Sequence, residues 1–262
     1  MSKVFIEEST LDDIANAIQK QEGSEAKIPT AEMAARILAL GGGVNYLDYC
    51  ERFGIWSLNL FGAPIVELTL PKATSLNAAF RVDKNASDTE GRTNITVEEL
   101  IVHCPNTIVN MGTVFGQNNY YADKTIKRIV LDFETAANNW SYAFQNDRAL
   151  EYIEGTPINL SFLNGDSRTI SMFEQCYALK EVRFQGILSY SLSLQYSAKL
   201  TKASILSLMT CLSDEATGKA VTFSQTAVDT AFETSEGAAD GSTSAEWLAL
   251  VEAHSNWTIS LV

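Results

Sequence analysis

An apolar pattern recurs along the middle of the chain. In each copy, a phenylalanine precedes a run of the form apolar-x-x-apolar-x-apolar, most clearly from Phe173 to Phe184. Four phenylalanines hold this position at spacings of 35, 29 and 29 residues: Phe80, Phe115, Phe144 and Phe173. Periods of this length are typical of stacked supersecondary units. The pattern therefore predicts a solenoid in residues 44–199, with Phe115, Phe144 and Phe173 as a buried ladder.

The apolar runs of this region read as short strands separated by polar turns. Strands are expected at 65–70, 100–102, 126–131 and 182–184. Two longer intervals, 84–93 and 117–124, read as inserts that bulge from one side of the stack. Such inserts are tolerated because a longer surface loop adds little closure entropy.

The segment before this region, residues 1–43, reads as a helical hairpin followed by a linker of three glycines. Its expected buried positions are Leu11, Ile14, Ile18, Met33 and Ile37. Each helix is only about three turns long, so its apolar face needs a partner to be stable. We therefore expect residues 1–40 to dock onto another protein. A phosphate-binding loop at Gly41–Gly43 is excluded, because no Lys-Ser or Lys-Thr follows.

The pattern of apolar and polar residues changes again after residue 199. A helical period begins at Leu200, and further helices are expected at 226–232 and 245–254, with strands at 220–223 and 257–262. A solenoid must cover the open apolar end of its last coil. We therefore expect residues 200–262 to form an α/β cap.

One stretch of the repeat region resembles a known family. In residues 172–184, Phe173 is followed by Cys176 and then by Leu179-x-x-Val182-x-Phe184. This stretch resembles the BspA-type leucine-rich repeat. The Phe144 copy departs from it, with Asp147 at the cysteine position. The resemblance covers roughly residues 61–200 and implies a β-rich solenoid with irregular coils.

Both ends of the chain resemble parts of bacteriophage proteins. Residues 11–18 and 28–37 are similar to the helical module that begins many structural proteins of phages of Gram-positive and gut bacteria. Residues 212–214, 226–228 and 256–261 are similar to the cap of such proteins. The resemblance implies a virion protein, made in the host bacterial cytoplasm, of the tail or tail tip and baseplate. It would bind other virion proteins through residues 1–40 and contact the host surface.

Two alternatives to this adhesive role stay open. The chain could be a purely architectural virion protein of the collar, baseplate or head decoration. It could also be a bacterial leucine-rich-repeat surface protein. The sequence leaves homo-oligomer formation open in every case.

The composition restricts the partners. A net charge of -13 from 32 acidic and 19 basic residues argues against nucleic acid, which requires a basic surface. The same charge repels polyanions, so a host surface protein or a neutral glycan is the expected partner. No apolar run approaches the roughly 18–20 residues that cross a bilayer, so membrane insertion is not expected.

The sequence offers little catalytic or metal-binding chemistry. The two histidines, His103 and His254, lie in different predicted modules, and no G-x-S-x-G motif is present. The four cysteines form no C-x-x-C pair, and Cys176 is expected as a reduced core residue. Residues 83–94 have oxygen ligands at spacings similar to those of a calcium-binding loop, but they lack its glycine and its glutamate. We therefore interpret them as a solvated insert and not as a calcium site. We expect no enzyme, cofactor or metal.

Aromatic residues provide the candidate binding surface. Tyr120, Tyr121, Trp140 and Tyr142 lie in or near the second insert and could stack on sugars. The alternative is that they pack in the core or between coils. We expect these four residues, with the two inserts, on an exposed side used for binding.

Overall fold

The computed structural model describes residues 64–70, 73–77, 79–80, 97–116 and 126–262. The predicted helical hairpin, with Leu11, Ile14, Ile18, Met33 and Ile37, lies outside the described residues. The two inserts, 84–93 and 117–124, lie outside them as well.

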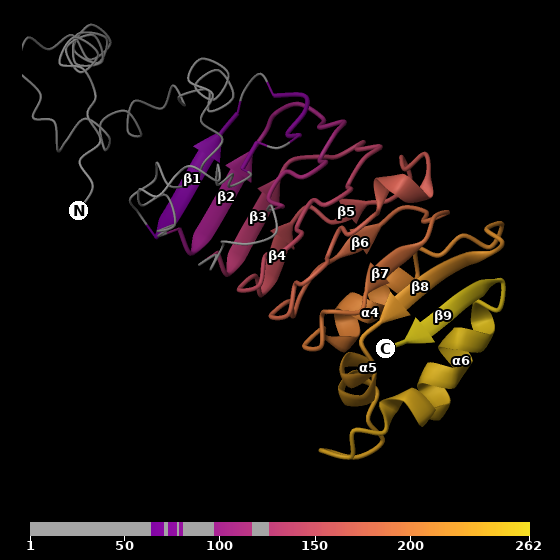
Figure 1. The fold of residues 1–262 in the computed structure, drawn as a ribbon. Coiled ribbons are helices and arrows are strands. Elements are labelled where there is room, and N and C mark those ends of the chain that lie inside the picture. The colour runs from indigo at the N-terminus through magenta and orange to yellow at the C-terminus, as the bar shows by residue number, and fades with distance from the viewer. Residues whose placement is uncertain (1–63, 71–72, 78, 81–96, 117–125) are drawn as a thin grey trace, which may run out of the picture.

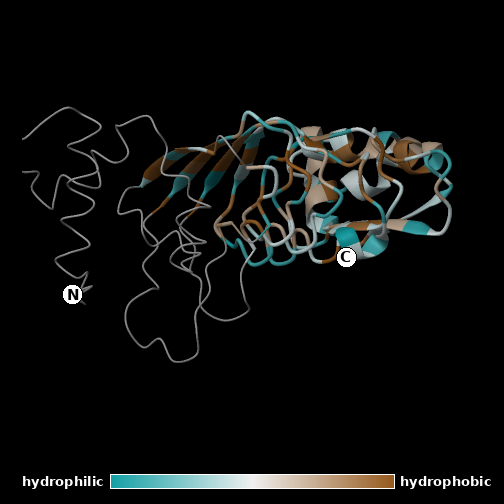
Figure 2. Cartoon of the chain, turned by 90° about the horizontal axis from the view of Figure 1, so that it is seen from above, coloured by the Kyte–Doolittle hydropathy of each residue, from teal (hydrophilic) through white to brown (hydrophobic). Residues whose placement is uncertain are grey.

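The first described element is a sheet of four parallel strands that follow one another in chain order (Figure 1). Its strands are β1 (Ile65–Thr69), β2 (Glu99–His103), β3 (Arg128–Asp132) and β4 (Tyr152–Gly155). Each strand pairs with the next in continuous register. Alternate residues of each strand are buried, which gives the alternation of hydrophobic and hydrophilic residues visible in Figure 2. The strands predicted near 65–70, 100–102 and 126–131 are confirmed.

Two smaller parallel sheets continue toward the C-terminus. One pairs β5 (Ile158–Asn159) with β6 (Phe184–Gln185). The other contains β7 (Leu192–Leu194), β8 (Lys219–Phe223) and β9 (Trp257–Leu261), in that order. This sheet thus joins a strand of the predicted repeat region to two strands of the predicted cap. The short 3₁₀ helix η2 (Asp166–Arg168) is tied to it, because Asp166 accepts a hydrogen bond from Lys219 Nζ at 2.7 Å.

The phenylalanines of the repeat form one stack inside the molecule. Ring centroids lie 5.3 Å apart for Phe80 and Phe115, 5.4 Å for Phe115 and Phe144, and 5.4 Å for Phe144 and Phe173. All four side chains are fully buried. Parallel strands with equal register keep equivalent residues adjacent, so an aromatic at the same position of each turn stacks on its neighbours. The predicted buried ladder is confirmed.

The turns after the ladder positions repeat in backbone detail. The N–H groups of Asp147, Cys176 and Ser197 each donate to the carbonyl oxygen three residues earlier, on Phe144, Phe173 and Leu194. These three turns are therefore equivalent, at spacings of 29 and 21 residues. Cys176 is fully buried, and its thiol donates to the Phe144 carbonyl oxygen at 3.0 Å, so its predicted core position is confirmed. Asp147 occupies the same buried position one turn earlier.

The strand predicted at 182–184 is only partly present. Strand β6 begins at Phe184 and pairs with β5 on one side, whereas the chain on its other side is the helix α4 (Lys202–Met209). Two serine hydroxyls of this helix take the place of strand carbonyls. Ser204 Oγ accepts from the Val182 N–H at 3.1 Å, and Ser207 Oγ accepts from the Phe184 N–H at 3.4 Å.

The C-terminal segment alternates helices and strands as predicted. After α4 and β8 come α5 (Gln225–Ala231), the 3₁₀ helix η3 (Gly241–Thr243), α6 (Ala245–Ala253) and β9. Trp247 of α6 is buried against Phe223 and Phe232, at ring distances of 5.9 Å and 5.3 Å. These contacts hold the helices against the last sheet.

Candidate interaction surface

The four aromatic candidates from the sequence do not share one surface. Trp140 is fully buried and stacks on Phe144 at 6.2 Å, so the prediction that it lies on an exposed binding side is wrong. Tyr142 is 38% exposed, as predicted, while its role in binding stays a prediction. Tyr120 and Tyr121 lie outside the described residues.

Trp140 is buried because of its position in the repeat. It stands four residues before the ladder residue Phe144, where the preceding turns have Leu76 and Met111, both fully buried. In all three turns, the carbonyl oxygen of this residue accepts the N–H of the residue three positions later. The position is therefore a core position, and a tryptophan there fills the interior.

The sheet β1–β4 presents its other side to solvent, and its register orders the side chains there. We call this surface the strand face. Its three rows across the sheet are Ile65, Glu99, Arg128 and Tyr152; Glu67, Ile101, Val130 and Glu154; and Thr69, His103 and Asp132. The middle row has two apolar residues at its centre, Ile101 and Val130, which lie outside the hydrophobic core. Charged residues surround them on every side.

Two side chains, Arg128 and His103, connect neighbouring strands of the strand face. Arg128 on β3 donates through Nε and Nη2 to Glu154 on β4, at 2.8 Å and 2.6 Å, and through Nη1 to Glu99 on β2. His103 on β2 lies between two carboxylates: its Nδ1 is 2.6 Å from Asp132 Oδ2, and its Nε2 is 2.7 Å from Glu67 Oε1. These contacts hold the charged rim of the surface in place.

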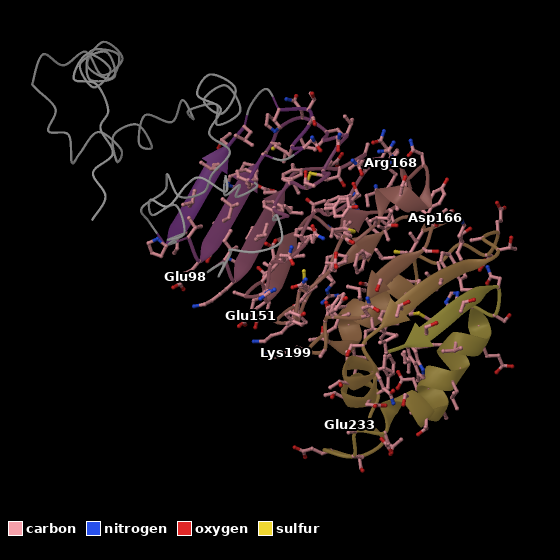
Figure 3. The ribbon with its side chains drawn as sticks, in the orientation of Figure 1. Glu98, Glu151, Asp166, Arg168, Lys199 and Glu233 are labelled. Carbon is pink, nitrogen blue, oxygen red and sulfur yellow. The ribbon has the colours of Figure 1, made fainter. Side chains whose placement is uncertain are left out.

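Charges of alternating sign line the edge where the chain enters the strands. We call Glu98, Lys127, Glu151 and Lys180 the charge row. Backbone hydrogen bonds link each of these residues to the next, so they are equivalent positions of successive turns. Lys127 Nζ lies 3.0 Å from Glu98 and Lys180 Nζ lies 2.5 Å from Glu151. The bond from Lys180 lowers the pKa of Glu151. Glu98 and Glu151 mark this edge in Figure 3.

His103 should give the protein a pH-dependent stability. Two carboxylate acceptors favour the form in which both ring nitrogens carry a proton, and the bond to Asp132 raises the pKa of His103 above 6.5. When folding raises the pKa of a group, its protonated form stabilises the folded state. This stabilisation is complete below the pKa of the unfolded state and is lost as pH rises through the pKa of the folded state. We expect the melting temperature of wild type to exceed that of His103→Gln most at low pH, and this difference to shrink as pH rises through the raised pKa of His103.

A matched carboxylate variant separates this effect from general titration. Glu67→Gln or Asp132→Asn should reduce the difference between wild type and His103→Gln at low pH. Glu98→Gln removes a carboxylate of similar exposure that pairs with Lys127, and it should leave the pH dependence of His103 intact. Identical pH profiles for wild type and His103→Gln would contradict the expectation.

Cysteine, histidine and carboxylate side chains are the usual metal ligands and catalytic groups of proteins. Within them, no set of three His, Cys, Asp or Glu side chains is placed to hold a metal ion. Burial raises the pKa of the Cys104 thiol to about 12 and that of Cys211 to about 11, so both stay protonated and unreactive at neutral pH. His103 and His254 lie on different elements, β2 and the end of α6.

Comparisons with known proteins give no family assignment. No protein-family model, curated protein or solved structure matches the chain. In the part of the chain that the structure describes, no helix is both long and apolar enough to span a membrane.

Proposed function

We propose that this chain is a structural protein of a bacteriophage virion, in the tail or tail tip, and that it binds the host cell surface through the strand face. The proposal includes a leucine-rich-repeat-like solenoid closed by an α/β cap. The in-register parallel strands and the stacked phenylalanines support this fold class. The resemblance of both chain ends to phage proteins supports the virion setting.

The observation that carries the proposal is the composition of the strand face. Ile101 and Val130 form an apolar centre, and the rim around it carries Glu67, Glu99, Arg128 and Glu154 on neighbouring strands. Protein interfaces commonly combine an apolar centre with a polar rim. The rim side chains are fixed by hydrogen bonds, which reduces the entropy lost when a partner binds.

The charge of the chain indicates the kind of partner. A net charge of -13 disfavours the approach of an anionic polymer to the chain as a whole. A host surface protein or a neutral glycan suits the face better. Binding should therefore not weaken steeply with salt, as it does for cationic proteins on polyanions.

Binding of the labelled full-length chain to intact cells tests the adhesive role. The cells are a panel of Gram-positive gut bacteria, and the variant is Ile101→Thr with Val130→Thr, which keeps β-branched side chains but removes the apolar centre. We expect saturable binding to at least one strain and an affinity about tenfold lower for the variant, or about 1.4 kcal/mol. Ile187→Thr alters an exposed apolar residue away from the strand face and should bind like wild type.

Two outcomes would contradict the proposal in different ways. Equal binding of wild type and the double variant would show that the strand face does not contact the host. If no strain binds wild type, yet gold-labelled antibody against the chain decorates purified phage particles, the architectural alternative is correct. The antibody should decorate tail ends if the proposal holds.

A further inference from the structure

A pair of tyrosines lies on the surface of two successive turns. Tyr177 is 47% exposed, and its ring meets that of Tyr196 edge to face, with centroids 5.8 Å apart and planes at 90°. Neither ring belongs to the hydrophobic core, unlike the aromatic residues of the ladder. The pair therefore presents aromatic surface to solvent in a fixed arrangement.

The repeat places small or polar residues around Tyr177. Arg148, Tyr177 and Ala198 each follow the equivalent buried residue of their turn, so they form one row across three turns. Ala198 has only a methyl group, so no large side chain from this row covers Tyr177 on that side. On the other side stands Arg148, which is exposed.

Gln175 and Tyr196 form a second row, directly beside the first. Each of them comes directly before the buried residue of its turn, whereas Tyr177 comes directly after the buried residue of its own turn. Arg148 Nη2 donates to Gln175 Oε1 at 2.6 Å, which connects the two rows across neighbouring turns. Gln175 has a φ of +61°, and this left-handed backbone fixes the direction in which its side chain leaves the turn. Two hydrogen-bonding side chains thus lie beside two aromatic rings.

Arg148 retains capacity to bind a ligand. Ion pairs occupy Arg128, Lys127 and Lys180, but no carboxylate of the described residues lies within ion-pair distance of Arg148. A guanidinium has five N–H donors, and the bond to Gln175 uses one of them. The remaining donors and the Gln175 amide can serve hydroxyl groups.

We propose that Arg148, Gln175, Tyr177 and Tyr196 form a binding site for one residue of a neutral glycan. The apolar face of the sugar ring stacks on Tyr177, and its hydroxyl oxygens accept hydrogen bonds from Arg148 and Gln175. The net charge of -13 disfavours the approach of an acidic polymer, so the proposal commits to a neutral glycan. The site is separate from the strand face, so it goes beyond the function proposed above.

Saturation-transfer NMR on the full-length chain tests this site. The probes are the methyl glycosides of glucose, galactose, mannose and N-acetylglucosamine, with glucuronic acid as the anionic comparison. We expect transfer to the ring protons of at least one neutral glycoside and an affinity about tenfold lower for Tyr177→Ala. Tyr177→Phe keeps the ring and should retain binding, whereas Arg148→Gln should weaken it. Phe162→Ala removes an exposed aromatic ring elsewhere and should bind like wild type.

Three results would count against this sugar site. Transfer that persists unchanged in Tyr177→Ala would overturn the proposal, and so would the absence of transfer from every neutral glycoside. Equal loss in Tyr177→Phe and Tyr177→Ala would overturn the stacking role. Thermal melting of each variant shows whether it is folded. If these results rule out the sugar site, cell binding that depends on Ile101 and Val130 would still support host contact through the strand face.

Discussion

Phe144→Ala should destabilise the protein by about 3–5 kcal/mol, the cost typical of truncating a fully buried phenylalanine. Phe144 is fully buried and stacks between Phe115 and Phe173, at 5.4 Å from each. Its loss removes three aromatic contacts, including the one with Trp140, and leaves a cavity in the middle of the ladder, where stacked turns have little freedom to collapse. Urea denaturation followed by circular dichroism measures the effect.

Phe162→Ala is the matched control for this prediction. Phe162 has the same side chain but is 48% exposed, so its truncation should change the free energy of unfolding by no more than about 0.5 kcal/mol. If both variants unfold at the same urea concentration as wild type, the ladder contributes nothing to stability.

Gly155→Ala should destabilise the protein by about 2–5 kcal/mol. Gly155 ends β4 with a φ of +86°, a backbone region that costs an L-residue about 1–2 kcal/mol. A Cβ atom there would also lie 2.4 Å from the carbonyl oxygen of Leu131 on β3, and overpacking of this kind costs about 1–3 kcal/mol. The same oxygen accepts the N–H of Thr156 at 2.8 Å, so the methyl group would disturb a hydrogen bond between strands.

Gly218→Ala separates the two contributions. Gly218 also has a positive φ, +66°, but a Cβ atom there would meet nothing within 4 Å. Its substitution should therefore cost only the backbone term, about 1–2 kcal/mol. Urea denaturation of both variants gives the difference, which measures crowding between β3 and β4. Equal losses would mean that β3 and β4 tolerate the added methyl group.

The sequence revealed those features that depend on equivalent positions of the repeat. The spacing of the phenylalanines predicted the ladder, and the apolar alternation predicted the strands β1, β2 and β3. The residue type of Trp140 indicates a binding surface, whereas its position in the repeat determines its burial. Its distance of four residues from Phe144, shared by Met111 before Phe115, was the signal that could have placed it in the core.

Other features depend on contacts that the sequence pattern does not contain. The strand predicted at 182–184 has a strand, β5, on one side only, and on the other side serine hydroxyls of helix α4 accept its N–H groups. The strand face combines residues from turns of unequal length. His103 meets Glu67 across 36 residues and Asp132 across 29, so no single period identifies its partners.

The charge row limits how the number of turns can change. Its signs alternate, negative at Glu98 and Glu151 and positive at Lys127 and Lys180, so every residue has an opposite charge as its neighbour. Loss of the turn with Lys127 would bring two glutamates together, and loss of the turn with Glu151 would bring two lysines together, whereas loss of both turns would restore the alternation. Each contact contributes little alone, as exposed ion pairs do. Together they favour lengthening or shortening of the repeat array in steps of two.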